Sequence, residues 1–192
     1  MSTQQTQTAI HLGADDLLDY TDWERGKWHG WFRKHGPAAL AVSVGPHGDG
    51  RFATVGDLVR HVFSAEKRYV ERLSDKPLTD TATIPADDVD ALFEFGSRSR
   101  RALRDFIATF PAEKWDAELD MTIGVHSLQV SPRKVVVHVV IHEIRHWTQI
   151  ATLLRVQGGL TGEPRDFLLS PVLPSEDARQ LIKPTLGSPE HA

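Results

Sequence analysis

The segment from Ser131 to Gln157 limits the folds open to this chain more than any other feature. Ser131 is a favourable N-cap residue and Pro132 suits the first position of a helix, while Gly158 and Gly159 favour its end. Apolar residues fall on two opposed sides of this predicted helix, so two different surfaces have to cover it. We therefore expect a long helix that packs among other helices.

Three earlier segments show the same helical spacing of apolar residues, and glycine and proline separate them. The pattern predicts four long helices, over residues 15–35, 54–74, 86–109 and 131–157. Four helices of this length indicate an all-α fold, an antiparallel four-helix bundle. Residues 117–130 partly alternate between apolar and polar types around Gly124, which predicts a short β-hairpin before the last helix.

These elements assign one bundle domain to residues 14–174 of the 192-residue chain, which is long enough to bury a core. We expect residues 1–13 and 175–192 to form flexible tails. Near the end of the domain, the segment Phe167-Leu-Leu is expected to pack back on the bundle.

The composition narrows the classes of protein that fit this chain. The absence of cysteine excludes disulfides, thiolate metal sites and cysteine nucleophiles. The net charge of −4 indicates no nucleic-acid or anionic-membrane partner, and we interpret the basic run Arg98, Arg100 and Arg101 as a solvated helix face. No apolar stretch is long enough to span a membrane and the first residues lack a secretory pattern, so we expect a cytoplasmic protein.

Three histidines recur every four residues in the last predicted helix, at His138, His142 and His146. Neighbouring members lie about one turn apart on one helix face, where two imidazole nitrogens can reach the same divalent metal ion. Their stripe is otherwise mostly apolar, and burying an unpartnered polar group costs about 1–3 kcal/mol. A metal explains three such residues in register, and hydrogen-bonded core histidines are the alternative. The spacing alone leaves His138 and His142 open as the ligating pair.

A further ligand has to come from another helix. His61 borders the apolar stripe of the second predicted helix, beside Leu58 and Val62, from which a side chain can lean into the bundle. His29 in the first predicted helix is the competitor, but it lies off the apolar stripe there.

These segments resemble the DinB-like (YfiT-like) superfamily of bundle metalloproteins. The resemblance covers most of the chain and is carried by residues 17–23, 54–61 and 138–149, together with Glu66 and Tyr69. The third segment is the most specific, because it contains His-x-x-x-His-x-x-Gln. Three positions depart from the usual pattern: Ile141 stands where relatives commonly have asparagine, Trp147 where they commonly have arginine, and Thr148 where they commonly have glycine.

The resemblance implies a metal triad of His61, His142 and His146, with zinc or nickel as the divalent ion. His138, Gln149 and Tyr69 are then expected to line the pocket or to hold the ligands in place. Relatives with assigned chemistry include transferases and isomerases that act with the thiols bacillithiol, mycothiol or glutathione. The resemblance therefore implies a metal-dependent enzyme with a small-molecule thiol substrate. A metal-assisted hydrolase is the close alternative. A non-catalytic stress-response bundle, with a structural metal or a small-molecule-binding role, is the other.

Three neutral imidazoles leave a metal with open positions, which is the pattern of catalytic rather than structural sites. A general base would assist chemistry on bound water, and two carboxylates fall within apolar helix stripes, Glu24 and Glu66. Glu143 follows a ligand directly but points away from the ligand face.

The last helix also predicts an assembly. Its second apolar side, which includes Val140, Ile144 and Trp147, needs a cover that its own bundle does not supply if the histidines face inward. We expect a homodimer through this helix, with coverage by residues 117–130 or by the Pro-rich tail as the alternative.

Overall fold

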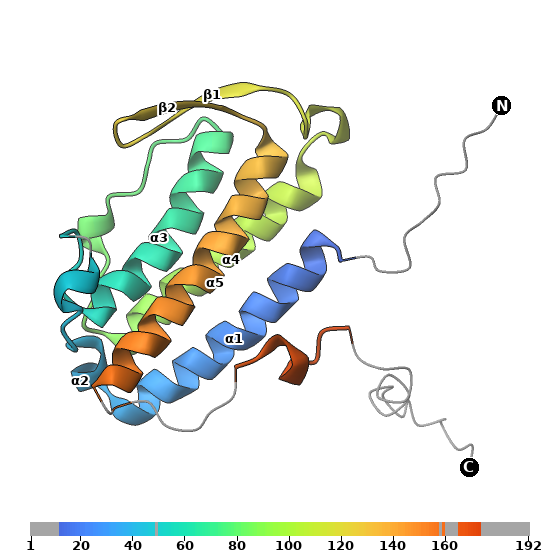
Figure 1. The fold of residues 1–192 in the computed structure, drawn as a ribbon. Helices are drawn as coiled ribbons and strands as arrows, with labels where there is room; N and C mark the ends of the chain where they lie inside the picture. The colour runs from blue at the N-terminus through green and yellow to red at the C-terminus, as the bar shows by residue number, and fades with distance from the viewer. Residues whose placement is uncertain (1–11, 49, 158, 160–164, 174–192) are drawn as a thin grey trace, which may run out of the picture.

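A computed structural model gives the fold, and it describes residues 12–48, 50–157, 159 and 165–173. Four long helices form the bundle: α1 (Ala14–His35), α3 (Val55–Leu73), α4 (Val89–Thr109) and α5 (Pro132–Val156) (Figure 1). The predicted all-α bundle is therefore confirmed. Short elements join the helices: α2 (Pro37–Leu40) and the 3-10 turns η1 (Gly45–Gly48), η2 (Thr81–Thr83) and η3 (Ala112–Lys114).

Side-chain caps set the helix starts. Thr54 and Asp57 form a reciprocal capping box at the start of α3, and Ser131 accepts a hydrogen bond from the backbone N–H of Lys134 at the start of α5. Asp88 caps α4, so that helix begins at Val89, three residues later than the apolar pattern suggests.

The predicted hairpin is also confirmed. Strands β1 (Leu119–Ile123) and β2 (His126–Val130) pair antiparallel, and Gly124 takes the positive φ of 59° that the tight turn requires. The hairpin lies across the end of the bundle where α3 ends and α5 begins (Figure 1).

The core has two apolar clusters separated by a layer of buried charge. One cluster surrounds Trp28, Phe63 and Trp147, and the other surrounds Leu103 and Val139. At the level between them four ionic side chains are buried, one from each long helix: Arg25, Glu66, Arg100 and Glu143. Arg25 donates to both carboxylates, at 2.9 Å to Glu66 Oε2 and 2.8 Å to Glu143 Oε2. Arg100 donates to Glu143 Oε2 at 2.6 Å.

This layer corrects the interpretation of the basic run on α4. Arg98 and Arg101 are exposed as expected, but Arg100 is only 5% exposed. A buried cation is stable here because two carboxylates from other helices neutralise it. Helix α4 comes close enough for this pairing because it carries glycine at Gly96, where an added Cβ would lie 2.8 Å from the Phe63 ring.

The orientation of α5 corrects the surface expected at a dimer interface. Val140 and Trp147 are 2% and 0% exposed, because the other helices of the same chain cover them. The histidines instead lie on the α3 side, at the rim of the bundle. Val137 and Ile141 are the large apolar residues of α5 that stay exposed along its middle.

The end of the described chain returns to α1. The 3-10 turn η4 (Phe167–Leu169) places Phe167 edge-on to Tyr20, with ring centroids 5.0 Å apart. Leu168 and Leu169 remain exposed, so Phe167 alone of the three carries the expected packing. The predicted tails fall almost entirely outside the described residues, which include only 12 and 13 of the first. None of the helices in the described ranges is long and apolar enough to cross a membrane.

Candidate metal site

Three histidines from two helices converge at the rim of the bundle. His61 extends from α3, while His142 and His146 lie one turn apart on α5. The Nε2 atom of His142 lies 3.1 Å from Nε2 of His61 and 3.1 Å from Nε2 of His146. The three nitrogens lie within 4.8 Å of one another, and no other such group of potential ligands occurs in the described part of the chain.

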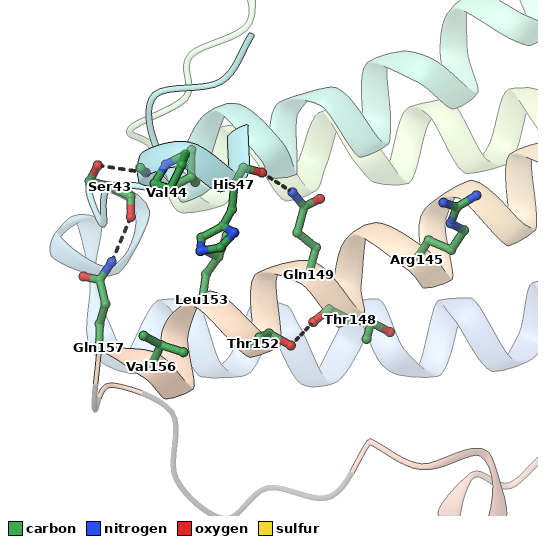
Figure 2. A pocket seen from close by; sticks show the side chains of 12 residues that line it. Ser43, Val44, His47, Arg145, Thr148, Gln149, Thr152, Leu153, Val156 and Gln157 are labelled. Atoms are coloured by element: carbon green, nitrogen blue, oxygen red, sulfur yellow. Dashed lines mark hydrogen bonds between the residues drawn. The ribbon is translucent and has the colours of Figure 1, made fainter. Parts of the chain in front are cut away.

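Gln149 fixes the tautomer of one of these imidazoles. The side-chain nitrogen of Gln149 donates a hydrogen bond to the carbonyl oxygen of His47 at 2.7 Å (Figure 2). In this orientation the side-chain oxygen Oε1 of Gln149 faces Nδ1 of His146 at 2.8 Å. Since Oε1 can only accept, Nδ1 of His146 carries the hydrogen. In the neutral ring Nε2 then has a bare lone pair, and it is directed at His142. Such a partner is typical of a metal-binding histidine.

The arrangement fits a metal ion better than a hydrogen-bonded cluster. Nε2 of His142 lies 3.1 Å from two other ring nitrogens, and a single N–H cannot point along both contacts. A cation that accepts all three lone pairs removes this conflict. Three nitrogens at about 2.0–2.1 Å from a tetrahedral zinc ion would lie about 3.3 Å from one another, which is close to the two separations of 3.1 Å that involve His142.

Burial keeps two of the three histidines, His61 and His142, uncharged. It lowers the pKa of His142 to about 2, with further lowering from His146 and His61, and it lowers the pKa of His61 to about 4. The pKa of His138 is also lowered, by burial and then by the charge of Arg145. Near neutral pH the rings of His61 and His142 are therefore uncharged, and an uncharged imidazole is the form that binds metal.

The other predicted pocket residues lie around the triad. His138 stands one turn before His142, and its Nε2 lies 3.2 Å from the Tyr69 hydroxyl in a partly buried contact. Both residues line a cavity of about 560 Å³ in front of the triad. His29 lies apart from this group, and its Nε2 is 2.9 Å from Oδ1 of Asp90.

The carboxylates considered as general bases lie elsewhere. Glu66 and Glu143 belong to the buried charge layer, where the attraction of Arg25 and Arg100 outweighs burial and lowers the pKa of Glu143. Glu24 is buried next to Trp28 and Arg165, and burial followed by the charge of Glu143 raises its pKa to about 7. None of the three lines the cavity in front of the triad.

A second hollow adjoins the first across Gln149. It has a volume of about 660 Å³ and lies between α5 and residues 43–48 (Figure 2). Gln149 and Arg145 line both spaces. At the far end Gln157 donates to the carbonyl oxygen of Ser43 at 2.8 Å, which ties this loop to α5 (Figure 2).

Comparison with models of protein families identifies the family of this chain. The model of the DinB family matches residues 1–177, which is most of the chain. The chain belongs to the DinB family. No curated protein matches it in sequence.

Sequence reasoning missed the arginines that border this site. The spaces beside the triad are lined by three arginines, Arg51, Arg68 and Arg145. In the sequence, nothing distinguishes these arginines from ordinary surface residues. One signal was present: His61, Arg68 and Arg72 share one stripe of α3 at spacings of seven and four residues.

Proposed function

We propose that this DinB-family protein is a metal-dependent enzyme that binds zinc or nickel through His61, His142 and His146. In this proposal it acts on a small-molecule thiol, as a transferase or an isomerase. The observation that carries the proposal is a three-histidine group that faces a cavity of about 560 Å³. No fourth histidine or carboxylate from the described residues joins the group, which is the pattern of catalytic sites.

The surroundings favour a thiol over water as the activated group. When bound, the ion would supply Lewis-acid activation, which lowers the pKa of a thiol or of water. Attack by water gains from a nearby carboxylate base, and Glu66 and Glu143 are held by arginines in the charge layer. A thiol is the more acidic of the two, so it needs less help from a base. The hydrolase alternative is correspondingly less supported.

The chain's own residues would orient the ligands and the substrate. Gln149 holds His146 with its bare nitrogen toward the site, and the loop carbonyl of His47 holds Gln149 in turn. The Tyr69 hydroxyl and His138 offer a polar pair on the cavity wall. Burial raises the pKa of Tyr69, so its hydroxyl stays protonated and can donate a hydrogen bond. The hollow beyond Gln149 offers room for the second substrate that a transferase requires.

Cobalt substitution tests the proposal, because sulfur bound to Co²⁺ produces a charge-transfer absorption band. The protein loaded with Co²⁺ should develop this band when titrated with 2-mercaptoethanol. The His142→Ala variant should not, and the His138→Ala variant serves as the matched control that retains it. A cobalt spectrum that no thiol changes would mean a closed site, and a structural metal would then replace the enzyme proposal.

A further inference from the structure

Positive charge gathers beside the triad, in a cavity of about 430 Å³ between α3 and the turn of the hairpin. Arg51, Arg68 and Arg72 line it, together with His61 and His142 from the triad. Arg51 and Arg68 both contribute to the lowered pKa of His61, which places their charges near that ligand.

The carboxylate that lines this cavity already has hydrogen-bond partners. Asp57 is the cavity's only carboxylate among the described residues. Asp57 accepts a hydrogen bond from Arg60 at 2.7 Å and, through its other oxygen, one from the backbone N–H of Thr54 at 3.1 Å. Asp57 therefore caps the start of α3 and pairs with Arg60.

Arg68 has a buried donor, Nε, that no partner satisfies within the described structure. Burial, and then the charge of Arg68, lower the pKa of Arg72, so the two guanidinium groups repel each other. A buried, unpaired donor and repelling cations are both costly, and an anion between them would relieve both.

We propose that this cavity binds an anionic group of the substrate, a carboxylate or a phosphate, through Arg68 and Arg51. The inference rests on the proposed function, because it assigns the substrate class of the same site. Guanidinium groups match both anions with two parallel hydrogen bonds, which a neutral substituent cannot form. The cavity shares Arg51, His61 and His142 with the space in front of the triad, so one small molecule can reach both.

Matched thiols on the cobalt-loaded protein test the inference. The probes are 3-mercaptopropionate, 2-mercaptoethylphosphonate and the neutral 3-mercaptopropionamide, and the dissociation constant of each is read from the charge-transfer band. We expect at least one anion to bind about tenfold more tightly than the amide, as charge-assisted hydrogen bonds would give. The tighter of the two anions identifies the group as carboxylate or phosphate.

Two variants and one control locate the effect. Arg68→Gln should reduce the preference for the anion to about twofold or less. Arg51→Gln should have the same effect. Because Arg51 is exposed, this second variant can be tested even if Arg68→Gln folds poorly. Arg98→Gln removes an exposed cation on α4 that pairs with Glu94, and it should keep the full preference. Cobalt content and circular dichroism confirm that each variant is loaded and folded.

The possible failures are distinguishable. Equal affinities for the anionic and neutral thiols would overturn this inference while the proposed thiol chemistry stands, and so would a preference that survives in both arginine variants. A cobalt spectrum unchanged by every thiol would overturn the proposed function. In that case the anion site can still be tested with succinate, which contains no thiol. Succinate should raise the melting temperature of the natural protein but not that of Arg68→Gln.

Discussion

Glu24 offers a quantitative test of how burial changes the pKa of a carboxyl group and, through it, the stability of the bundle. Its side chain lies in the core beside Trp28, and its Oε2 is buried without a hydrogen bond in the described structure. Burial raises its pKa from 4.5 to about 7. The unfolded chain therefore releases this proton at a lower pH than the folded chain, and stability is lost as the pH rises from about 4.5 through 7.

The size of the effect follows from the shift. Each pKa unit corresponds to about 1.4 kcal/mol, so the ionisable group should cost the folded state about 2–3 kcal/mol more at pH 8 than at pH 5. The variant Glu24→Gln has no such group. It should gain that amount of unfolding free energy relative to the natural protein between the two pH values.

Urea denaturation of metal-free protein at about pH 5 and pH 8 measures this difference directly. Comparing the two proteins at each pH cancels the histidine titrations that they share. Glu94→Gln, which changes an exposed carboxylate on α4, should show a difference near zero. A gain below about 1 kcal/mol for Glu24→Gln would refute the reasoning that burial dominates at this site.

Other predictions concern the charge layer, the metal and assembly. Glu143→Gln should lower the free energy of unfolding by about 3–5 kcal/mol in urea denaturation, because it leaves two buried arginines short of a partner; a loss below about 1 kcal/mol would contradict this. Zinc affinity, followed by competition with a chelator, should fall as the pH drops, because protons compete for the histidine nitrogens, and the loss should continue down to about pH 4 because the pKa of His61 is about 4; an affinity that is unchanged between about pH 7 and pH 4 would count against an all-histidine site. The homodimer through α5 stays a prediction, and with Val140 buried its surface would have to include Val137. Val137→Glu should then produce a monomer in light scattering, and a natural protein that is already monomeric would end the dimer hypothesis.

The local elements could be read from the sequence because their causes are local. The caps Thr54 and Ser131 and the turn glycine Gly124 act within a few residues of their own positions. Apolar spacing then identified the helices, and His61, His142 and His146 do meet in space.

The remaining features depend on side chains from separate helices. Arg25 and Arg100 look like surface residues in the sequence, and only the packing of four helices brings them to Glu66 and Glu143. The assignment of the two apolar sides of α5 failed for the same reason. The charge layer makes the Glu143 side of the helix an interior side, although it carries a carboxylate.

Metal content tests the central claim most directly. Zinc and nickel should be measured by mass spectrometry of the purified natural protein and of the variants His142→Ala and His138→Ala. We expect about one equivalent per chain in the natural protein and in His138→Ala, because His138 lies outside the group of three nitrogens. His142→Ala should carry almost none, because it loses the nitrogen that approaches both of the others. Full metal retention in His142→Ala, or loss of metal in His138→Ala alone, would contradict the assigned triad.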